Sequence, residues 1–574
     1  MRIETIHIHN FRSISDAEFK LSDYSILIGE NNSGKSTIIT ALRAFYEDDG
    51  FKFNGSRDFP KFETKDKESW IELEFLLTDE EFANLKDEYK IEGNKLKVRR
   101  YFKSENKSLV DSKNSNIYAY ENGKLSNNYF YGAKNVSQAK LGRVIFIPEI
   151  SKVSDNLKFS GPSPLRNITN FVFSRVIKDS EAYSSLNEAF ESFNQEFEQE
   201  SKSDEFSLNN LKSDINEELK NWDIEFGLRI NPIKPNDIVK NLFSHYITDK
   251  HLNNKEVDIT SLGQGVQRHI IYILIKLTAK YVDKKSSEKK EFSPDFTLIL
   301  FEEPEAFLHP TQQEQLNLNL SKISKESQVL ITTHSPLFIS KNIEALTSLI
   351  KLKRENGRTN IFQIKKSQLD DLFSDNASLF RYFSDLLNTS IPEEIKNTIR
   401  RRHLGENDPD LSAKIYDESF KFFLWLDAER SSLFFAKHVI ICEGATEKSF
   451  FDLLLDSEWQ DLRIKQIYFL DCLGKYNIHR FMNLFKFLGI RHSVLFDSDG
   501  DSSIHSYLND FIERNRNEYT VAIDSFEKDL EGFLDVTLPV RKDLKPLSII
   551  KKYTNNEISV KKLKELRSKI EALL

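Results

Sequence analysis

Residues 25–37 read Ser-Ile-Leu-Ile-Gly-Glu-Asn-Asn-Ser-Gly-Lys-Ser-Thr. An apolar run typical of a buried strand leads into a G-x-x-x-x-G-K-S loop, and a helix-prone stretch follows at 37–45. The glycines let such a loop curl until its backbone N–H groups face a phosphate. We expect Lys35 to reach the β- and γ-phosphates of a nucleotide and Ser36 to ligate Mg²⁺. The other predicted nucleotide-binding residues of this loop are Asn31, Asn32, Gly34 and Thr37.

Two further apolar runs end in polar residues. Residues 297–301 lead into Glu302-Glu303-Pro304-Glu305, a pattern that indicates Mg²⁺ binding by Glu302 and general-base action by Glu303. Residues 329–333 lead into His334, which is placed to sense a γ-phosphate. An isolated histidine there would more often be structural, but its order after the carboxylates favours the phosphate role.

A Gly-rich turn lies between these motifs. Residues 261–268 read Ser-Leu-Gly-Gln-Gly-Val-Gln-Arg and precede an apolar stretch at 270–277. A turn of this kind at a helix start can bind an anion, so Gly263 and Gly265 are predicted to contact nucleotide. An ordinary helix cap looks similar.

The last third of the chain carries carboxylates at the ends of two further apolar runs. Residues 437–442 are followed by Glu443 and Glu447, one helical turn apart, and residues 492–496 are followed by Asp497 and Asp499. Because α/β sites form at the carboxyl edge of a sheet, these acids are expected to share a cation. The alternatives are a helix-start pair for the glutamates and a solvated turn for the aspartates.

The ATP-binding motifs in this order resemble the ABC-type ATPases of the SMC, RecF and OLD (overcoming lysogenization defect) group. Residues 8–13, Ile-His-Asn-Phe-Arg-Ser, resemble the first strand of that group, and 302–310 resemble the OLD form. The resemblance implies a dimer, or a higher homo-oligomer, in which the Gly-rich turn of one subunit caps the ATP of another. Glu302 replaces the usual Asp and the turn departs from the transporter form, which favours ATP binding over rapid turnover.

The E-G-x-x-E and D-x-D turns resemble the Toprim fold of topoisomerases, primases and OLD nucleases. Residues 430–436 and 471–477 also resemble OLD proteins, so the likeness covers the chain apart from 151–250 and the connector. Hard oxygen ligands suit Mg²⁺ or Mn²⁺ rather than zinc. The resemblance implies that Glu443 and Lys545 are catalytic. It implies that the metal ligands are Glu443, Glu447, Asp497, Asp499, Glu527 and Asp529.

Alternating strands and helices predict an α/β protein with mostly parallel sheets. We expect an ABC-type ATPase domain at 1–350 with a helical insertion at about 151–250, and a Toprim domain at 431–574. Residues 351–430 are expected to form a helical connector. Its basic cluster, Arg400 to Arg402, is a candidate DNA-phosphate contact, with a solvated helix face as the alternative.

Composition restricts the class of protein. Apolar residues make up 39% and charged residues 30% of the 574 residues, and no apolar run is long enough for a membrane span. Cys442 and Cys472 are the two cysteines, which argues against a disulfide framework and a Cys-rich zinc site. A cytoplasmic protein is therefore expected. The net charge of −8 does not decide on DNA binding, because a local basic groove can coexist with acidic surfaces.

The sequence favours an ATP-regulated, divalent-metal-dependent endonuclease that acts on DNA. Family members serve bacterial anti-phage systems of the Gabija and retron types, so a defence-system partner protein or retron RNA–DNA is an implied partner. The alternative is a non-cleaving, ATP-dependent DNA clamp of the recombination-mediator type. A topoisomerase would need a DNA-gating domain and a bacterial primase a zinc module. The fused second domain disfavours a transporter ATPase, and the length excludes long SMC arms.

Overall fold

The structure is a computed structural model. It describes residues 1–111, 113–149, 153–159, 163–177, 180–198, 208–220, 224–227, 235–282, 292, 294, 296–339, 343–405, 430–499 and 504–574. The chain divides into two compact units: one contains Met1–Glu149 and Lys290–Leu574, and the other contains Ile150–Lys289.

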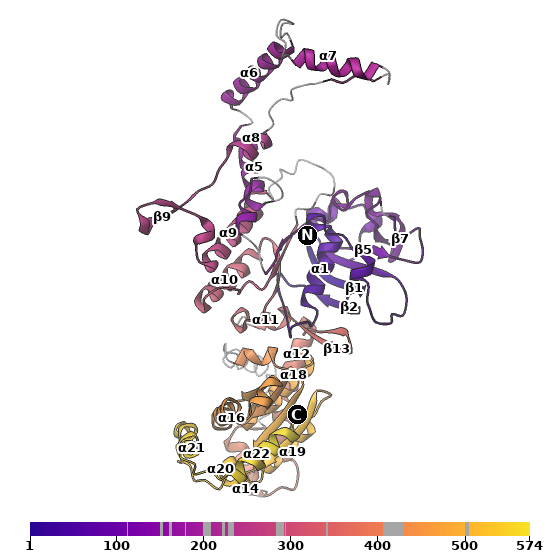
Figure 1. Ribbon diagram of the computed structural model, residues 1–574. Coiled ribbons are helices and arrows are strands. Elements are labelled where there is room, and N and C mark those ends of the chain that lie inside the picture. The colour runs from indigo at the N-terminus through magenta and orange to yellow at the C-terminus, as the bar shows by residue number, and fades with distance from the viewer. Residues whose placement is uncertain are drawn as a thin grey trace. The chain divides into compact units, whose positions relative to one another are not determined.

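The first unit begins with a six-stranded antiparallel sheet (Figure 1). Apolar and polar residues alternate along its first strand, so one face is buried and the other is polar. Ile6 and Ile8 lie in the core, whereas His7 and His9 lie on the polar face. In sheet order the strands are β2 (Ile14–Lys20), β1 (Arg2–Phe11), β4 (Ser69–Leu76), β5 (Lys95–Lys103), β6 (Ile117–Glu121) and β7 (Lys124–Tyr129).

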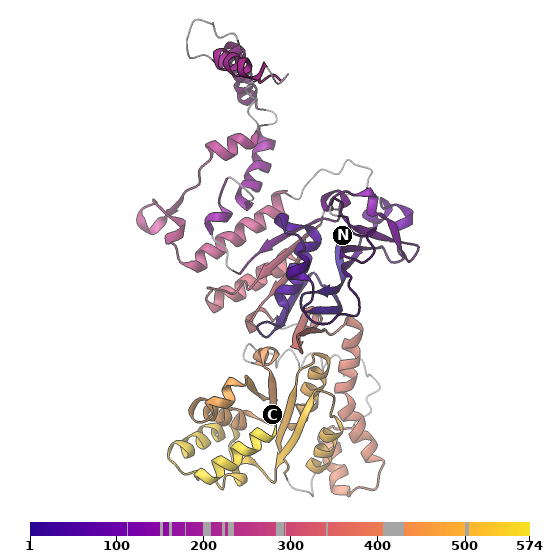
Figure 2. The same ribbon diagram turned by 45° about the vertical axis from the view of Figure 1, so that its right-hand side comes forward.

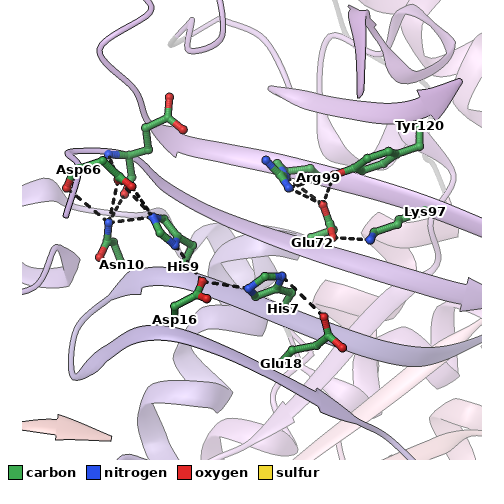
Figure 3. Close-up of polar contacts among 11 residues, drawn as sticks. His7, His9, Asn10, Asp16, Glu18, Asp66, Glu72, Lys97, Arg99 and Tyr120 are labelled. Carbon is green, nitrogen blue, oxygen red and sulfur yellow. Dashed lines mark hydrogen bonds and ion pairs between the residues drawn. The ribbon is translucent and has the colours of Figure 1, made fainter. Parts of the chain in front are cut away.

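Polar side chains on this outer face form two groups, each held together by hydrogen bonds and ion pairs (Figure 3). Asp16 Oδ1 lies 2.9 Å from both His7 Nε2 and His9 Nδ1, and His9 stacks on Trp70. On the neighbouring strands, Glu72 pairs with Lys97 and Arg99 at 2.7 and 2.8 Å. These contacts join β1, β2, β4 and β5 across the polar face.

A second six-stranded sheet holds the nucleotide motifs. All of its strands are parallel except β14, which pairs antiparallel with β13. Helix α1 (Lys35–Tyr46) shares one apolar core with both sheets, and α10 (Pro310–Ile323) connects two of the parallel strands. In sheet order the strands are β14 (Arg358–Phe362), β13 (Leu349–Glu355), β3 (Tyr24–Gly29), β12 (Gln328–Thr332), β11 (Thr297–Glu302) and β8 (Arg143–Ile147).

Residues 351–362 differ from the expected helical connector. They belong to β13 and β14, because Leu349, Ile350 and Leu352 are buried beside β3 and extend the nucleotide-binding sheet. Helices follow only after that: α12 (Lys366–Asn376), α13 (Ser378–Leu387) and α14 (Glu393–Arg401). The remainder of the expected connector, 406–429, lies outside the described residues.

The last part of this unit is a parallel sheet with strand order β16-β15-β17-β18, and Figure 2 shows helices on both sides of it. One face shares an apolar core with α16 (Ala445–Ser457), α21 (Lys545–Thr554) and α22 (Val560–Ala572). Further helices of this region are α18 (Ile478–Phe487) and α19 (Ile504–Arg514). The strands are β15 (His438–Cys442), β16 (Ile467–Asp471), β17 (His492–Asp497) and β18 (Thr520–Phe526). The predicted α/β fold is confirmed.

The second unit is mainly helical. Its helices are α4 (Val153–Asn156), α5 (Pro164–Val176), α6 (Glu181–Glu198), α7 (Leu208–Leu219), α8 (Pro235–Leu242) and α9 (Gln264–Val282), and its strands are β9 (Ile247–Asp249) and β10 (Lys255–Val257). Helix α5 packs on α8 and α9. Across both units, no helix within the described residues has the length and apolarity needed to cross a bilayer.

Candidate functional site

The loop between β3 and α1 has the backbone shape that the G-x-x-x-x-G-K-S pattern predicts. Gly34 has φ of 110°, a conformation that L side chains rarely adopt, and a Cβ there would lie 2.5 Å from Thr359 Oγ1. A Cβ at Gly29 would overlap the Leu352 carbonyl oxygen. Asn31 and Asn32 are exposed at the tip of the loop, where they line the same cavity as Gly34.

Lys35 lies at the start of α1, and its ammonium group is held inside the loop. Its Nζ donates to the carbonyl oxygens of Gly29 and Glu30 at 3.0 and 3.2 Å. It also lies 2.7 Å from His334 Nε2, which accepts the hydrogen bond as a neutral imidazole nitrogen. Burial lowers the pKa of Lys35, and the nearby Glu303 and Glu305 act against that shift.

The end of β11 places the two predicted carboxylates beside this loop. The Glu302 side chain is hydrogen-bonded to the Ser36 hydroxyl, and burial raises the pKa of Glu302. Glu303 has φ of 44°, and its N–H donates to the Thr332 carbonyl oxygen on β12 at 3.0 Å. Its Oε1 lies 3.5 Å from His334 Nε2. Ser36 with Glu302, and Glu303 with His334, are thus brought together as pairs.

Glu305 has a role that the sequence did not reveal. Its Oε1 accepts hydrogen bonds from the Thr333 hydroxyl at 2.7 Å and from the backbone N–H groups of His334 and Ser335 at 2.6 and 3.1 Å. These bonds fix the turn after β12 and therefore the direction of the His334 ring. Burial raises the pKa of Glu303 to about 8, and a hydrogen bond to Glu305 and its charge add to that shift.

These residues line a cavity of about 940 Å³. Its wall also contains basic and aromatic residues to which the sequence assigned no role in the site: Arg12, Arg57, Lys61, Arg354, Phe59 and Phe62. Arg12 is held by the fully buried Asp58, which accepts from its Nε at 2.9 Å, and by the Thr40 hydroxyl at 3.1 Å. The cavity wall therefore combines the glycine-rich loop with both acidic and basic side chains.

The predicted Gly-rich turn lies in the second unit. Gly263 immediately precedes α9, and Gly265 lies in its first turn. The Gln267 side chain donates to the Leu262 carbonyl oxygen at 2.7 Å and closes the turn. Its predicted contact with nucleotide stays a prediction.

The four acids of the Toprim-like turns lie at one edge of the C-terminal sheet. Strands β15 and β17 are adjacent and parallel, and Cys442 pairs with Leu495. Glu443 and Asp497 follow these two residues closely, which brings them to the same edge. Asp497 Oδ1 accepts from the Leu530 N–H at 3.1 Å, and Glu447 is buried in the first turn of α16.

The charges of these acids act strongly on one another. Burial raises the pKa of Asp497 to about 9, and Glu447, Glu443, Glu531 and Asp499 add to that rise. Burial also raises the pKa of Glu447 to about 7, with contributions from Glu443 and Glu531. We call these five residues, Glu443, Glu447, Asp497, Asp499 and Glu531, the acidic cluster.

The role of Glu527 as a metal ligand stays a prediction. Glu531 contributes to this cluster, although it was not among the predicted ligands. It is paired with the predicted Lys545, and the charges of Glu531, Asp497 and Asp529 offset the effect of burial on the pKa of Lys545, leaving it raised. Asp529 caps the short helix α20 (Leu530–Phe533) by accepting from the Gly532 N–H at 2.7 Å. For Glu527, the contact found is through its backbone carbonyl, which accepts from the Ser498 hydroxyl. The spacing within 526–531 did not reveal which carboxylate faces the cluster.

Lys475 is a second residue that the sequence did not assign. Its side chain is 1% exposed, and its Nζ donates to the Asp497 carbonyl oxygen and, at 3.1 Å, to Asp499 Oδ2. The preceding Gly474 donates its N–H to the Glu443 carbonyl oxygen at 2.7 Å. The loop after β16 thereby connects the ends of β15 and β17 and fixes the acids that follow them.

The donor set of the acidic cluster fits a hard divalent cation. All of its side chains offer carboxylate oxygens, the ligands preferred by Mg²⁺ and Mn²⁺. The raised pKa of Asp497 means that the cluster carries more negative charge than it can hold ionised without a cation. As they stand, no three His, Cys, Asp or Glu side chains in the described parts of the chain have the spacing of a metal-bound set, so binding would require side-chain rotation.

Comparisons with known proteins agree with the two kinds of domain that the motifs indicate. Residues 1–339 match the AAA ATPase domain family, and residues 434–499 match the TOPRIM domain of overcoming lysogenization defect protein-like proteins. The Old nuclease of Escherichia phage P2 is 24% identical over 518 residues, covering 88% of this chain and 78% of that protein. Endonuclease GajA of Bacillus cereus (strain VD045) is 22% identical over 520 residues, covering 87% and 75%.

The resemblance to OLD proteins that the motifs indicate is therefore confirmed. The ATPase match covers more than half of the 574 residues. The chain belongs to the AAA ATPase domain family, and its ATPase domain is followed by an OLD-like TOPRIM domain.

Proposed function

We propose that the chain is an ATP-regulated, divalent-metal-dependent endonuclease that hydrolyses phosphodiester bonds in DNA. The observation that carries this proposal is the acidic cluster, in which carboxylates from the ends of β15 and β17 crowd around Asp497. The names of the relatives Old nuclease and Endonuclease GajA support a nuclease. A DNA clamp that does not cut has no evident use for a crowded carboxylate site.

In this proposal, Glu443, Glu447, Asp497 and Asp499 would hold Mg²⁺ or Mn²⁺ beside the scissile phosphate, with Glu527 and Asp529 as the other predicted ligands. The bound ions would activate a water molecule and offset charge on the departing oxygen. Lys545, held by Glu531, neutralises charge that develops on the phosphate. Lys475 keeps Asp497 and Asp499 in place through its hydrogen bonds to the Asp497 carbonyl oxygen and the Asp499 carboxylate.

In the ATPase half, Lys35 and the loop backbone bind the phosphates of ATP. Ser36 and Glu302 are the proposed Mg²⁺ ligands, and Glu303 is the general base for the attacking water. His334, oriented by Glu305, senses the γ-phosphate. Gly263 and Gly265 would complete the site of a second subunit in a homo-oligomer.

Glu303→Gln is expected to lower ATP hydrolysis by about 10² to 10⁴-fold while ATP binding is retained. Only the ionised carboxylate can act as a base, so the wild-type kcat/KM should rise with pH up to about 8, the value to which burial raises the pKa of Glu303. This rise should vanish in the variant. Glu314→Gln, an exposed carboxylate on α10, is the control. A variant that hydrolyses ATP at the wild-type rate would exclude Glu303 as the base.

The proposed setting is the one that the resemblance to OLD proteins implies. It is antiviral defence in the cytoplasm, together with a defence-system partner protein or retron RNA–DNA. DNA is the proposed substrate.

A cleavage assay on supercoiled plasmid tests the proposal. The purified full-length chain should cut plasmid with Mg²⁺ or Mn²⁺ and should be inactive in EDTA, and added ATP should change the cleavage rate. A chain that binds DNA in an ATP-dependent manner but cuts no plasmid with either metal would instead be the clamp.

A further inference from the structure

We propose that Arg402, Tyr476 and His505 form a binding subsite for a DNA phosphate next to the one that is cleaved. This inference rests on the proposed nuclease function and names where the substrate strand leaves the acidic cluster. We call these three residues the phosphate edge. They come from the end of α14, the loop after β16 and the first turn of α19.

A continuous series of contacts leads from the acidic cluster to Arg402. His505 Nδ1 lies 3.1 Å from Asp499 Oδ2, and the His505 ring lies 6.5 Å from the Tyr476 ring. Arg402 Nη1 donates to the Tyr476 hydroxyl at 2.6 Å, and its guanidinium lies 5.8 Å from the centre of the same ring. The ring and the hydroxyl together hold Arg402 on the Asp499 side of the cluster.

The cationic side chains near Asp499 differ in their exposure to solvent. Lys475 is 1% exposed, so it can brace Asp499 but cannot reach a ligand in solvent. His505 is 25% exposed and Arg402 is exposed, so both can reach one. The contact with Tyr476 engages Nη1, whereas a guanidinium carries five N–H donors in a planar fork that matches phosphate oxygens.

An acidic site that binds DNA needs nearby cations to bind the phosphates of the strand. Five carboxylates repel a DNA strand, and bound metal would offset that repulsion at the scissile phosphate alone. Lys545 pairs with Glu531, and His505 of the phosphate edge lies beside Asp499. Cations beside two different carboxylates would let one strand bind at the cluster with its neighbouring phosphates paired.

Arg400 and Arg402, two residues apart, are not equivalent. The Arg400 side chain contacts residues of its own helix: its Nη1 donates to Glu393 Oε1 at 3.0 Å and to Asn397 Oδ1 at 3.3 Å. Arg402 is directed to Tyr476. Arg400→Gln therefore removes the same charge, two residues away, without touching the phosphate edge.

The test is equilibrium binding of the full-length chain to a short labelled DNA duplex in EDTA, measured over a series of salt concentrations. Arg402→Gln should weaken binding about tenfold and make the slope of log K against log salt shallower by about 0.9, the loss of one phosphate contact. Arg402→Lys should restore the slope, and Arg400→Gln should leave it at the wild-type value. Thermal melting of each variant shows whether the fold is retained.

The proposal is overturned if Arg402→Gln leaves the slope unchanged, or if Arg400→Gln changes it by the same amount. Because this assay measures binding without metal, that result would leave the nuclease proposal standing. Conversely, a chain that shows the predicted slopes but never cuts plasmid would refute the nuclease and retain the phosphate contact.

Discussion

Replacing Asp497 and Asp499 together with asparagine should lower metal-dependent DNA cleavage by about 10³-fold or more while ATP binding stays intact. Asparagine keeps the size of both side chains and removes the negative charges that a cation needs. Because burial and the neighbouring carboxylates raise the pKa of Asp497 to about 9, the single variant Asp497→Asn should also melt at a higher temperature than the metal-free wild type near neutral pH.

The sign of that stability change follows from linkage. Asp497 keeps its proton in the fold at pH values where the unfolded chain has lost it, so metal-free stability falls as the pH rises from 3.8, the ordinary pKa of an aspartate, to about 9. Asparagine does not titrate and removes this loss. Asp510→Asn, an exposed residue on α19 that pairs with Arg514, is the matched control. Wild-type cleavage by the double variant would show that the acidic cluster is not the cutting site.

Lys35→Ala should weaken ATP binding by about 10²-fold or more, measured by calorimetry with Mg²⁺–ATP. The ammonium group is already held at the centre of the loop by the Gly29 and Glu30 carbonyl oxygens, so its loss removes an oriented charge from the phosphate site. Lys353→Ala, on β13 and paired with Glu355, is the control because it lies in the same sheet. Unchanged affinity in Lys35→Ala would show that ATP binds elsewhere or not at all.

Local sequence motifs predicted those site residues whose positions depend on residues next to them in the sequence. A strand, a glycine turn and a helix start fix Lys35 and Ser36, and a strand end fixes Glu302 and Glu303, whatever the rest of the chain does. The expected connector was partly wrong at 351–362, because pairing of β13 with β3 is a long-range contact that periodicity does not reveal.

Residues that act through tertiary contacts were not predictable. Glu305 orients His334 from 29 residues away, and Lys475 follows β16 but reaches Asp499 after β17, on the far side of β15. Glu531 lies in the first turn of a four-residue helix, so neither a strand nor a helix period indicated that it would face Lys545. A lysine that is almost fully buried is unusual, but its burial becomes visible only in the fold.

The most direct test of the account is a crystal structure of the chain grown with Mn²⁺, with anomalous scattering used to locate the metal. We expect an anomalous peak between the Glu443 and Asp497 carboxylates, with oxygen ligands at about 2.0–2.3 Å. Two well-ordered carboxylates that face apart, with no peak between them at saturating Mn²⁺, would contradict a shared metal site.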